Sequence, residues 1–165
     1  MSTRSYDRMS PEFALVEALR TVPALQDPDG GEPKVAAMQP KKSWRAPFVF
    51  YIPQEDSEER ALDGPTGLQS FAATLHCVGG THRGLQLLCQ RCRKALREMP
   101  GSVYSTPEED TGEGPKGRIL VEDLDLEQGS PDLYEAEVSL YRRIYTVRIH
   151  FQTEEVYEDE EVPSA

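Results

Sequence analysis

Three cysteines and one histidine lie close together in the middle of the chain, and these residue types bind metal ions or exchange electrons. Cys89 and Cys92 form a Cys-x-x-Cys pair, and Cys77 and His82 precede it. Three thiolates and an imidazole are a common ligand set for structural zinc. Alternatively, a Cys-x-x-Cys pair can act as a redox couple. Whether Cys89 and Cys92 could bind zinc or act as a redox couple depends on the secondary structure that carries them.

Residues 79–99 have the spacing of an amphipathic helix, which Pro100 and Gly101 end. The residues that recur at intervals of three and four on one face are Leu85, Leu88, Cys92, Ala95, Leu96 and Met99. Cys89 lies at the edge of that face, well inside the helix, whereas zinc pairs come from tight turns and redox pairs begin at a helix N-terminus. We therefore expect both thiols to pack in the core as small apolar groups. A zinc site of Cys77, Cys89, Cys92 and His82 is the open alternative.

The remaining sequence contains no recognisable catalytic motif. His76, His82 and His150 accompany no nucleophile motif, and no Gly-x-Ser-x-Gly, phosphate-binding loop or EF-hand loop is present. The segment beginning at His82 also lacks the His-x-Glu of zinc deaminases. We expect no catalytic residue, no metal and no cofactor, and hence a protein that is not an enzyme.

The polar face of the predicted helix is the more informative one. Its stripe consists of Arg83, Gln86, Gln90, Arg93 and Arg97. Such a stripe can be simply solvated, can meet an acidic patch on a neighbouring copy, or can bind phosphate. Together with Arg142 and Arg143, we take this stripe as the candidate subunit interface.

Charge and composition limit the class of protein. The net charge of −11 over 165 residues disfavours a protein that coats nucleic acid. The last twelve residues contain six acidic residues and no basic one, which leaves −5 for the rest and predicts a disordered acidic tail at 154–165. No apolar run is long enough to span a bilayer, and residues 1–9 do not resemble a signal peptide. An odd number of cysteines suggests reduced thiols in the cytoplasm.

The pattern along the chain predicts the order helix, strand, strand, helix, strand, long strand. Ser10 and Pro11 begin a helix with an apolar stripe of Phe13, Val16 and Leu19, which ends near Thr21 or Val22. The predicted strands are residues 47–53, residues 70–77 with one face buried, residues 118–126, and a long C-terminal strand. Loops are expected at 27–42, with a brief extended piece at 35–38, at 54–67, and at 107–117.

The C-terminal strand has a change of phase. Alternation runs through Tyr134 and Val138 and then flips from Tyr141 onward. A β-bulge in one long bent strand explains the flip, and we prefer it to two strands joined by a turn near Arg142, because no Gly, Asn or Pro is present there. The sequence thus predicts an α+β fold, with two helices on one face of a mostly antiparallel sheet. A flexible N-terminus (1–9) and the acidic tail (154–165) flank one domain (10–153).

This order of elements resembles the tail-completion, or tail-terminator, proteins of long-tailed bacteriophages. The stretches that carry the likeness are "FALVEALRTVPALQ", "APFVFYIPQED", "SFAATLHCVGGTHRGLQLLCQRCRKALREM" and "LYRRIYTVRIHF". The likeness covers about residues 11–153 and rests on short patterns and their order.

The resemblance implies a structural virion protein at the head-proximal end of the tail, assembled in the host cytoplasm. It would form a ring, a hexamer in this family, that caps the tail tube, ends its polymerisation and joins tail to head. The partners implied are other copies of itself, the tail-tube protein and a head-completion connector. DNA would pass through the lumen without specific binding, and no membrane is involved.

The loop "PEEDTGEGPKG" is our candidate for facing the tube or the lumen, through Glu108, Glu109, Asp110, Glu113 and Lys116. Two alternatives stay open within virion assembly, a neck or head-completion connector and a tube-like subunit. A small zinc-binding or nucleic-acid-binding regulator is the alternative from a different class.

Overall fold

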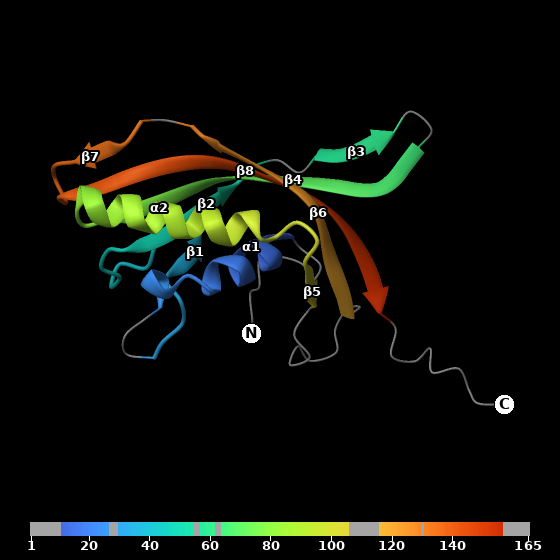
Figure 1. The fold of residues 1–165 in the computed structure, drawn as a ribbon, viewed down its shortest axis with the longest axis horizontal. Coiled ribbons are helices and arrows are strands. Elements are labelled where there is room, and N and C mark those ends of the chain that lie inside the picture. The colour runs from blue at the N-terminus through green and yellow to red at the C-terminus, as the bar shows by residue number, and fades with distance from the viewer. Residues whose placement is uncertain are drawn as a thin grey trace.

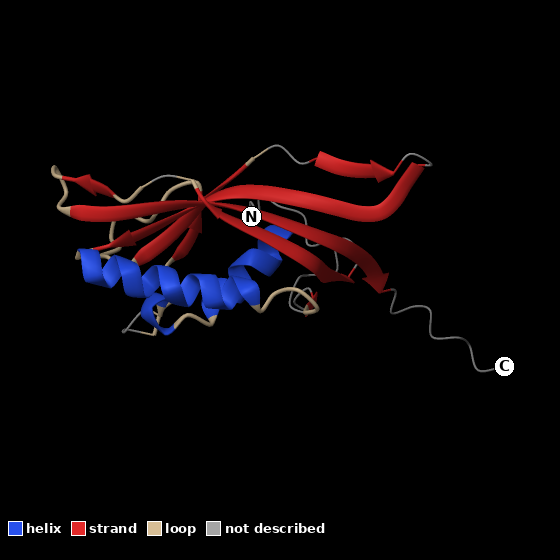
Figure 2. Ribbon diagram, turned by 45° about the horizontal axis from the view of Figure 1, so that its top comes forward, coloured by secondary structure: helices blue, strands red, loops and turns tan. Residues whose placement is uncertain are grey.

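One mixed sheet with two helices on a single face makes up the fold. The computed structural model describes residues 11–26, 30–54, 57–61, 64–105, 116–129 and 131–156. These residues form an eight-stranded sheet of order β1-β2-β4-β8-β6-β5, with β3 paired to β4 and β7 paired to β8. Among the strands of the described residues, only β1 and β2 pair in parallel. Both α1 and α2 lie on the same side of the sheet (Figures 1 and 2), which confirms the predicted α+β class.

The elements follow one another as α1 (Pro11–Arg20), the 3-10 helix η1 (Pro23–Leu25), β1 (Val35–Ala37), β2 (Phe48–Pro53), β3 (Ser57–Ala61), β4 (Gly64–Gly79), α2 (His82–Arg97), β5 (Val103–Ser105), β6 (Lys116–Gln128), β7 (Leu133–Glu135) and β8 (Leu140–Val156). The two longest strands, β4 and β8, lie side by side in the centre of the sheet. Figure 1 shows that β3 and the start of β4 extend beyond the part of the sheet that the helices cover.

The helices bury their apolar faces against the sheet. In α2 the buried residues are Leu85, Leu88, Cys89, Cys92 and Leu96, as the spacing predicts. Thr81 caps its first turn, because the Thr81 hydroxyl accepts a hydrogen bond of 2.9 Å from the Gly84 N–H. In α1 the buried residues are Ala14, Leu15, Ala18 and Leu19, which confirms Leu19 of the predicted stripe. The other two predicted residues, Phe13 and Val16, are half-buried at the edge of this face.

Strand β4 is largely buried on both faces over residues 70–79, and not on one face as the alternation of residues 70–77 predicts. Phe71, Ala73, Leu75 and Cys77 face the helices. On the other face His76 is 8 % exposed and stacks on the Phe50 ring at a centroid distance of 4.5 Å. A second apolar cluster of Phe48, Phe50 and Val78, with Trp44 packed against it, surrounds this point. In the sequence, the small and polar residues on this face resemble a solvent-facing row, but residues 44–50 of the same chain cover them.

A β-bulge at Glu122 divides β6 into two halves of opposite phase. Val121 pairs with Phe151 and Asp123 pairs with His150, so Glu122 has no residue opposite it on β8. Before the bulge Ile119 and Val121 are buried in the main core, and after it the half-buried Leu124 and Leu126 pack against the same core. One extra residue thus keeps apolar side chains on the helix side along the whole strand.

The predicted single bent strand from Tyr134 is wrong in its first part. Residues 136–139 form a turn, and β7 folds back on β8 with Leu133 opposite Arg142 and Glu135 opposite Leu140. Ser139 adopts a φ of 53° to close this turn without the glycine or asparagine usual in that conformation. From Tyr141 onward the predicted phase is confirmed, because Tyr145, Val147, Ile149 and Phe151 are all buried.

Two predicted segment boundaries also change. The expected loop at 54–67 contains β3 and the start of β4, paired as an antiparallel hairpin. The expected tail at 154–165 begins too early, because β8 continues to Val156. The rest of that tail and residues 1–9 lie outside the described residues.

Candidate interaction surface

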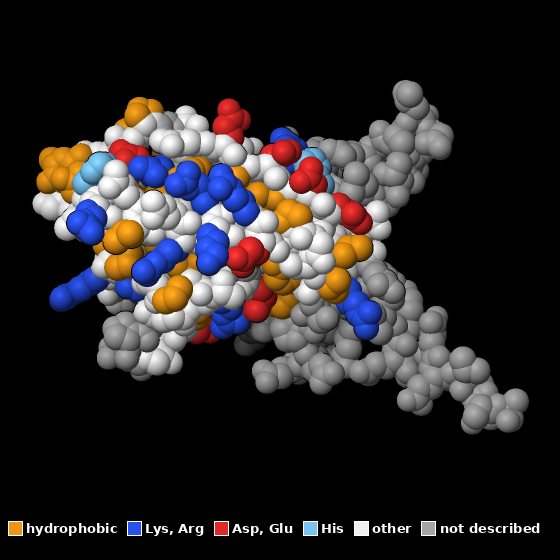
Figure 3. Space-filling view, in the orientation of Figure 1, with side chains coloured by type: hydrophobic (Ala, Val, Ile, Leu, Met, Phe, Trp, Pro, Cys, Tyr) orange, Lys and Arg blue, Asp and Glu red, His pale blue; other side chains and the backbone are white. Residues whose placement is uncertain are grey.

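The polar stripe predicted on α2 is present and lies on the outer side of the helix. Arg83, Gln86, Gln90 and Arg97 are exposed and Arg93 is half-buried. The helix carries five Arg and Lys residues and no acidic one. Three of the five, Arg83, Arg93 and Arg97, belong to the stripe, and Arg91 and Lys94 lie beside it. Figure 3 shows Lys and Arg side chains gathered over this part of the molecule, so α2 presents a positive face on a negative protein.

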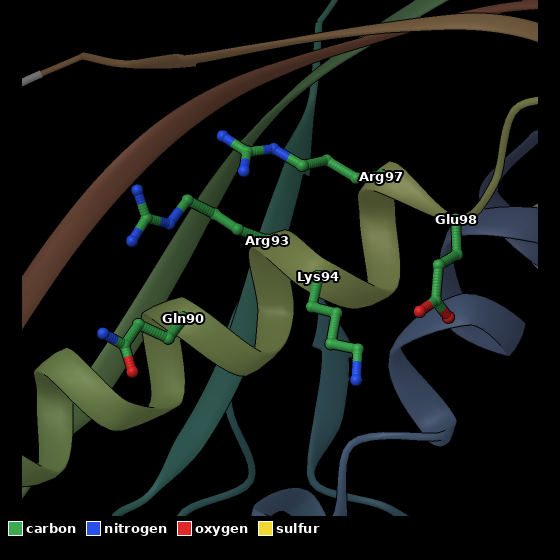
Figure 4. A pocket seen from close by; sticks show the side chains of 5 residues that line it. All are labelled: Gln90, Arg93, Lys94, Arg97 and Glu98. Atoms are coloured by element: carbon green, nitrogen blue, oxygen red, sulfur yellow. The ribbon is translucent and has the colours of Figure 1, made fainter.

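The second half of the stripe borders a shallow hollow of about 350 Å³. Gln90, Arg93, Lys94, Arg97 and Glu98 line it. Figure 4 shows Arg93 and Arg97 extending side by side in one direction, while Lys94 and Glu98 point to the other side of the helix. Two neighbouring guanidinium groups at the rim of a hollow can hold a carboxylate or a phosphate by charge-assisted hydrogen bonds.

Arg143, a second part of the predicted interface, is engaged within its own chain. Its Nε and Nη2 donate hydrogen bonds of 2.6 and 2.8 Å to the two carboxylate oxygens of Asp132. His82 Nε2 lies 3.2 Å from the same carboxylate, and Arg143 Nη1 lies 3.3 Å from the Tyr145 hydroxyl. The hydrogen bonds from Arg143 hold the pKa of Asp132 below its ordinary value. With its side chain only 13 % exposed, Arg143 mainly ties β7–β8 to the start of α2.

Arg142, its neighbour, points to the opposite face of the sheet. It pairs with Glu135 across the β7–β8 hairpin, and its guanidinium carbon lies 5.7 Å from the centre of the Phe50 ring. Burial, and then the nearby charge of Arg142, lower the pKa of His76. The two arginines thus belong to different surfaces, and neither joins the α2 stripe.

The three thiols meet in the core, as expected of small apolar groups. Cys77 from β4 and Cys89 and Cys92 from α2 are buried and not bridged. A hydrogen bond to Cys89 is the largest of the effects that raise the pKa of Cys77, ahead of Cys92 and burial, and the same bond lowers the pKa of Cys89. Within the described ranges, no group of three His, Cys, Asp or Glu side chains is placed to hold a metal ion.

We expect these thiols to be inert in the folded protein. A chromogenic disulfide reagent should label none of Cys77, Cys89 and Cys92 rapidly under native conditions, because labelling requires local or global opening. All three should react within the mixing time in strong denaturant. Rapid labelling of one thiol per chain without denaturant would show that at least one cysteine is accessible, and would contradict the packing of the three thiols in the core.

An exposed apolar group, which sequence reasoning missed, lies at the end of the molecule where β7 turns into β8. Leu133, Tyr134 and Val138 are 41, 55 and 55 % exposed, and we call them the end patch. The Tyr134 ring lies 4.7 Å from that of Tyr141, which in turn lies 5.8 Å from His82. Figure 3 shows hydrophobic side chains beside a histidine at this end. Leu133 and Tyr134 are consecutive in β7, so the end patch exposes apolar side chains on both faces of the hairpin. Exposed apolar side chains of this kind mark contact surfaces.

The predicted tube- or lumen-facing loop is the part that the structure does not place. Glu108, Glu109, Asp110 and Glu113 lie outside the described residues. Lys116 is the first residue of β6, where it pairs with Val156 of β8. Its assignment to a loop is therefore wrong, and the other four residues stay a prediction.

Neither the protein-family models nor the curated protein sequences contain a match. Of the helices in the described residues, none is both long and apolar enough to cross a membrane.

Proposed function

We propose that this protein is a structural assembly protein of a long-tailed phage, a ring that caps the head-proximal end of the tail tube and joins it to the head. The proposal rests on the resemblance of four sequence stretches, and it is supported by the α+β fold that they imply. Its mechanism is assembly through contacts between copies and with the tube and connector proteins, without a chemical step.

The observation that carries the proposal is the end patch. Three large apolar side chains stand out from a hairpin at one extremity of the sheet, where burial against another chain would remove them from water. A ring requires heterologous contacts, in which different surfaces of successive copies meet. A patch at one end of an elongated sheet suits such a contact, because its counterpart can lie elsewhere on the next copy.

The charge distribution is consistent with the same role. A ring through which DNA passes must not bind the duplex, and a net charge of −11 repels phosphate over a Debye length of about 10 Å. The basic face of α2 is the exception, and under this proposal it is turned to a protein partner instead of to the lumen.

Electron micrographs and native mass spectrometry of the protein with its tube protein test the proposal. We expect closed rings and tubes of defined length, and we expect Tyr134→Ser to lower the ring fraction by about tenfold, as loss of an aromatic interface anchor does. Val103→Ser is the matched control, since Val103 is 53 % exposed on β5, away from the end patch.

Each other outcome points to a different function. A chain that stays monomeric and never enters tails would refute the proposal. Rings found in the neck, away from the tube, would favour the connector, and polymerisation into tubes would favour a tube subunit. A stoichiometric zinc content or salt-sensitive DNA binding would favour the regulator.

A further inference from the structure

The basic face of α2 has no acidic partner within its own chain. Among the described residues, no ion pair or hydrogen bond is formed by the side chains of Arg83, Arg91, Arg93, Lys94 and Arg97. The Nε of Arg93 is buried and without a hydrogen-bond partner. Three other arginines of the described residues do pair with a carboxylate: Arg20 with Glu17, Arg142 with Glu135 and Arg143 with Asp132.

This unpaired state has a cost that an anionic partner would relieve. Arg93 and Arg97 are four residues apart on one helix face, where like charges repel. Figure 4 shows both side chains extending in the same direction beside the hollow. A carboxylate between them would replace repulsion by two charge-assisted hydrogen bonds.

The chain itself contains the matching charges. Glu158, Asp159, Glu160 and Glu161 follow directly on the end of β8 and include no basic residue. The stripe on α2 spans Arg83 to Arg97, about 21 Å at 1.5 Å per residue. Four extended acidic residues span at most about 14 Å, enough to cover the part of the stripe around Arg93 and Arg97. Charge complementarity between two remote parts of one sequence is what contact between successive copies in a homo-oligomer requires.

Geometry favours the tail of a second copy over that of the same chain. Arg97 lies four residues before Gly101, which donates a 2.7 Å hydrogen bond to Val121, and Val121 pairs with Phe151. From Phe151 to Val156 β8 runs about 17 Å away from this pair, and Glu161 lies at most about 17 Å beyond Val156. Folding straight back, the acidic run of the same chain would barely reach Arg97 and would leave the rest of the stripe uncovered.

We propose that the acidic C-terminal segment of one copy, residues 158–161, docks on the basic face of α2 of the next copy, centred on Arg93 and Arg97. The proposal rests on the self-assembly described under the proposed function and gives that assembly a specific contact. It predicts a heterologous, head-to-tail interaction that is sensitive to salt.

A labelled peptide of residues 154–165 tests the contact directly. The receptor is the full chain with its own tail neutralised by E158Q, D159N, E160Q and E161Q. We expect the peptide to bind, and we expect R93A with R97A to weaken binding by about tenfold, since each exposed charge pair contributes up to about fivefold. Arg20→Ala, on α1, should change nothing. A peptide with the four acids neutralised should not bind.

A mixing experiment separates a neighbour's tail from the chain's own tail. The tail-neutral chain keeps an intact stripe, and a full-length R93E/R97E chain keeps an intact tail. Each alone should stay unassembled, and their mixture should form a one-to-one pair in native mass spectrometry. The proposal would be overturned if the two chains form no pair on mixing and if the R93A/R97A substitutions leave the affinity for the peptide unchanged.

The outcomes also distinguish this proposal from the proposed function. Wild-type rings whose formation survives tail neutralisation would overturn the docking contact and leave the ring intact. Peptide binding and pairing by a wild-type protein that never caps tubes would support the docking contact and refute the tail role. Tighter binding of a labelled DNA duplex than of the peptide at the same stripe would also overturn the proposal.

Discussion

Gly79→Ala should lower the free energy of unfolding by about 3 kcal/mol, the largest effect that we expect from a single methyl group in this chain. A Cβ at position 79 would lie 2.7 Å from the backbone N and 2.8 Å from the Cα of Leu85. These atoms belong to the first turn of α2, and Leu85 is fully buried. Neither the strand nor the helix can yield without disturbing the core that both of them build.

The neighbouring glycine provides the control. A Cβ at Gly80 would have the Ala46 Cβ at 3.8 Å as its nearest neighbour, which is ordinary contact. Gly80→Ala should therefore change stability by less than about 0.5 kcal/mol. Urea unfolding followed by circular dichroism measures both variants. Equal stabilities for the two would show that β4 and α2 do not approach as closely as described.

Asp132→Asn should lower the stability at pH 7 by about 2 kcal/mol, because it leaves the mostly buried Arg143 guanidinium without its carboxylate. Asp132 accepts both hydrogen bonds of Arg143 and also contacts His82. In a chain of this size, a loss of 2 kcal/mol lowers the melting temperature by about 4–8 °C.

The pH dependence should identify the cause. The pKa of Asp132 is lowered in the folded state, so its contribution to stability is present above the unfolded carboxyl pKa of about 3.9 and is lost as the pH falls through the folded value. The difference between wild type and Asp132→Asn should therefore shrink in strong acid. Asp125→Asn is the matched control, since the Asp125 side chain is 68 % exposed beside His150. If the difference in the free energy of unfolding between wild type and Asp132→Asn did not change with pH, the ion-pair explanation would be wrong.

Elements with a buried, periodic face were predictable. In α2 the recurrence of Leu85, Leu88 and Leu96 sets both the helix and its contact side, and it correctly places the cysteines in the core. The second half of β8 was predictable for the same reason, because its apolar residues alternate over a long stretch. When one face of a helix or strand is buried, its apolar residues recur in the sequence with the period of that element.

The elements that were not predicted have no periodic pattern of apolar residues. Residues 57–61 read "SEERA", which has no apolar alternation, and their pairing with β4 is a tertiary outcome. β5 has three residues and is defined by its pairing with β6. The turn at 136–139 lacks the usual turn residues, so the β7–β8 hairpin was mistaken for one strand.

That missed hairpin also concealed part of the site. With Leu133 opposite Arg142, continuing the register by one residue puts Asp132 opposite Arg143. Had the hairpin been predicted, the ion pair would have followed from the sequence, together with the place of Tyr134 in its first strand. The stripe on α2, in contrast, required only helical periodicity, and its residues were predicted in full.

The bulge in β6 determines which residues of the second half of the strand face the helices. Because Glu122 has no residue opposite it, Asp123 pairs with His150, and Leu124 and Leu126 lie on the helix side. If Glu122 instead entered a regular ladder opposite His150, every later residue would change face, and Asp123, Asp125 and Glu127 would face the helices in place of Leu124 and Leu126. Deletion of Glu122 would remove the bulge and leave the pairs on both sides of it in phase, so drift at this exposed site should accept both replacements and the loss of the codon.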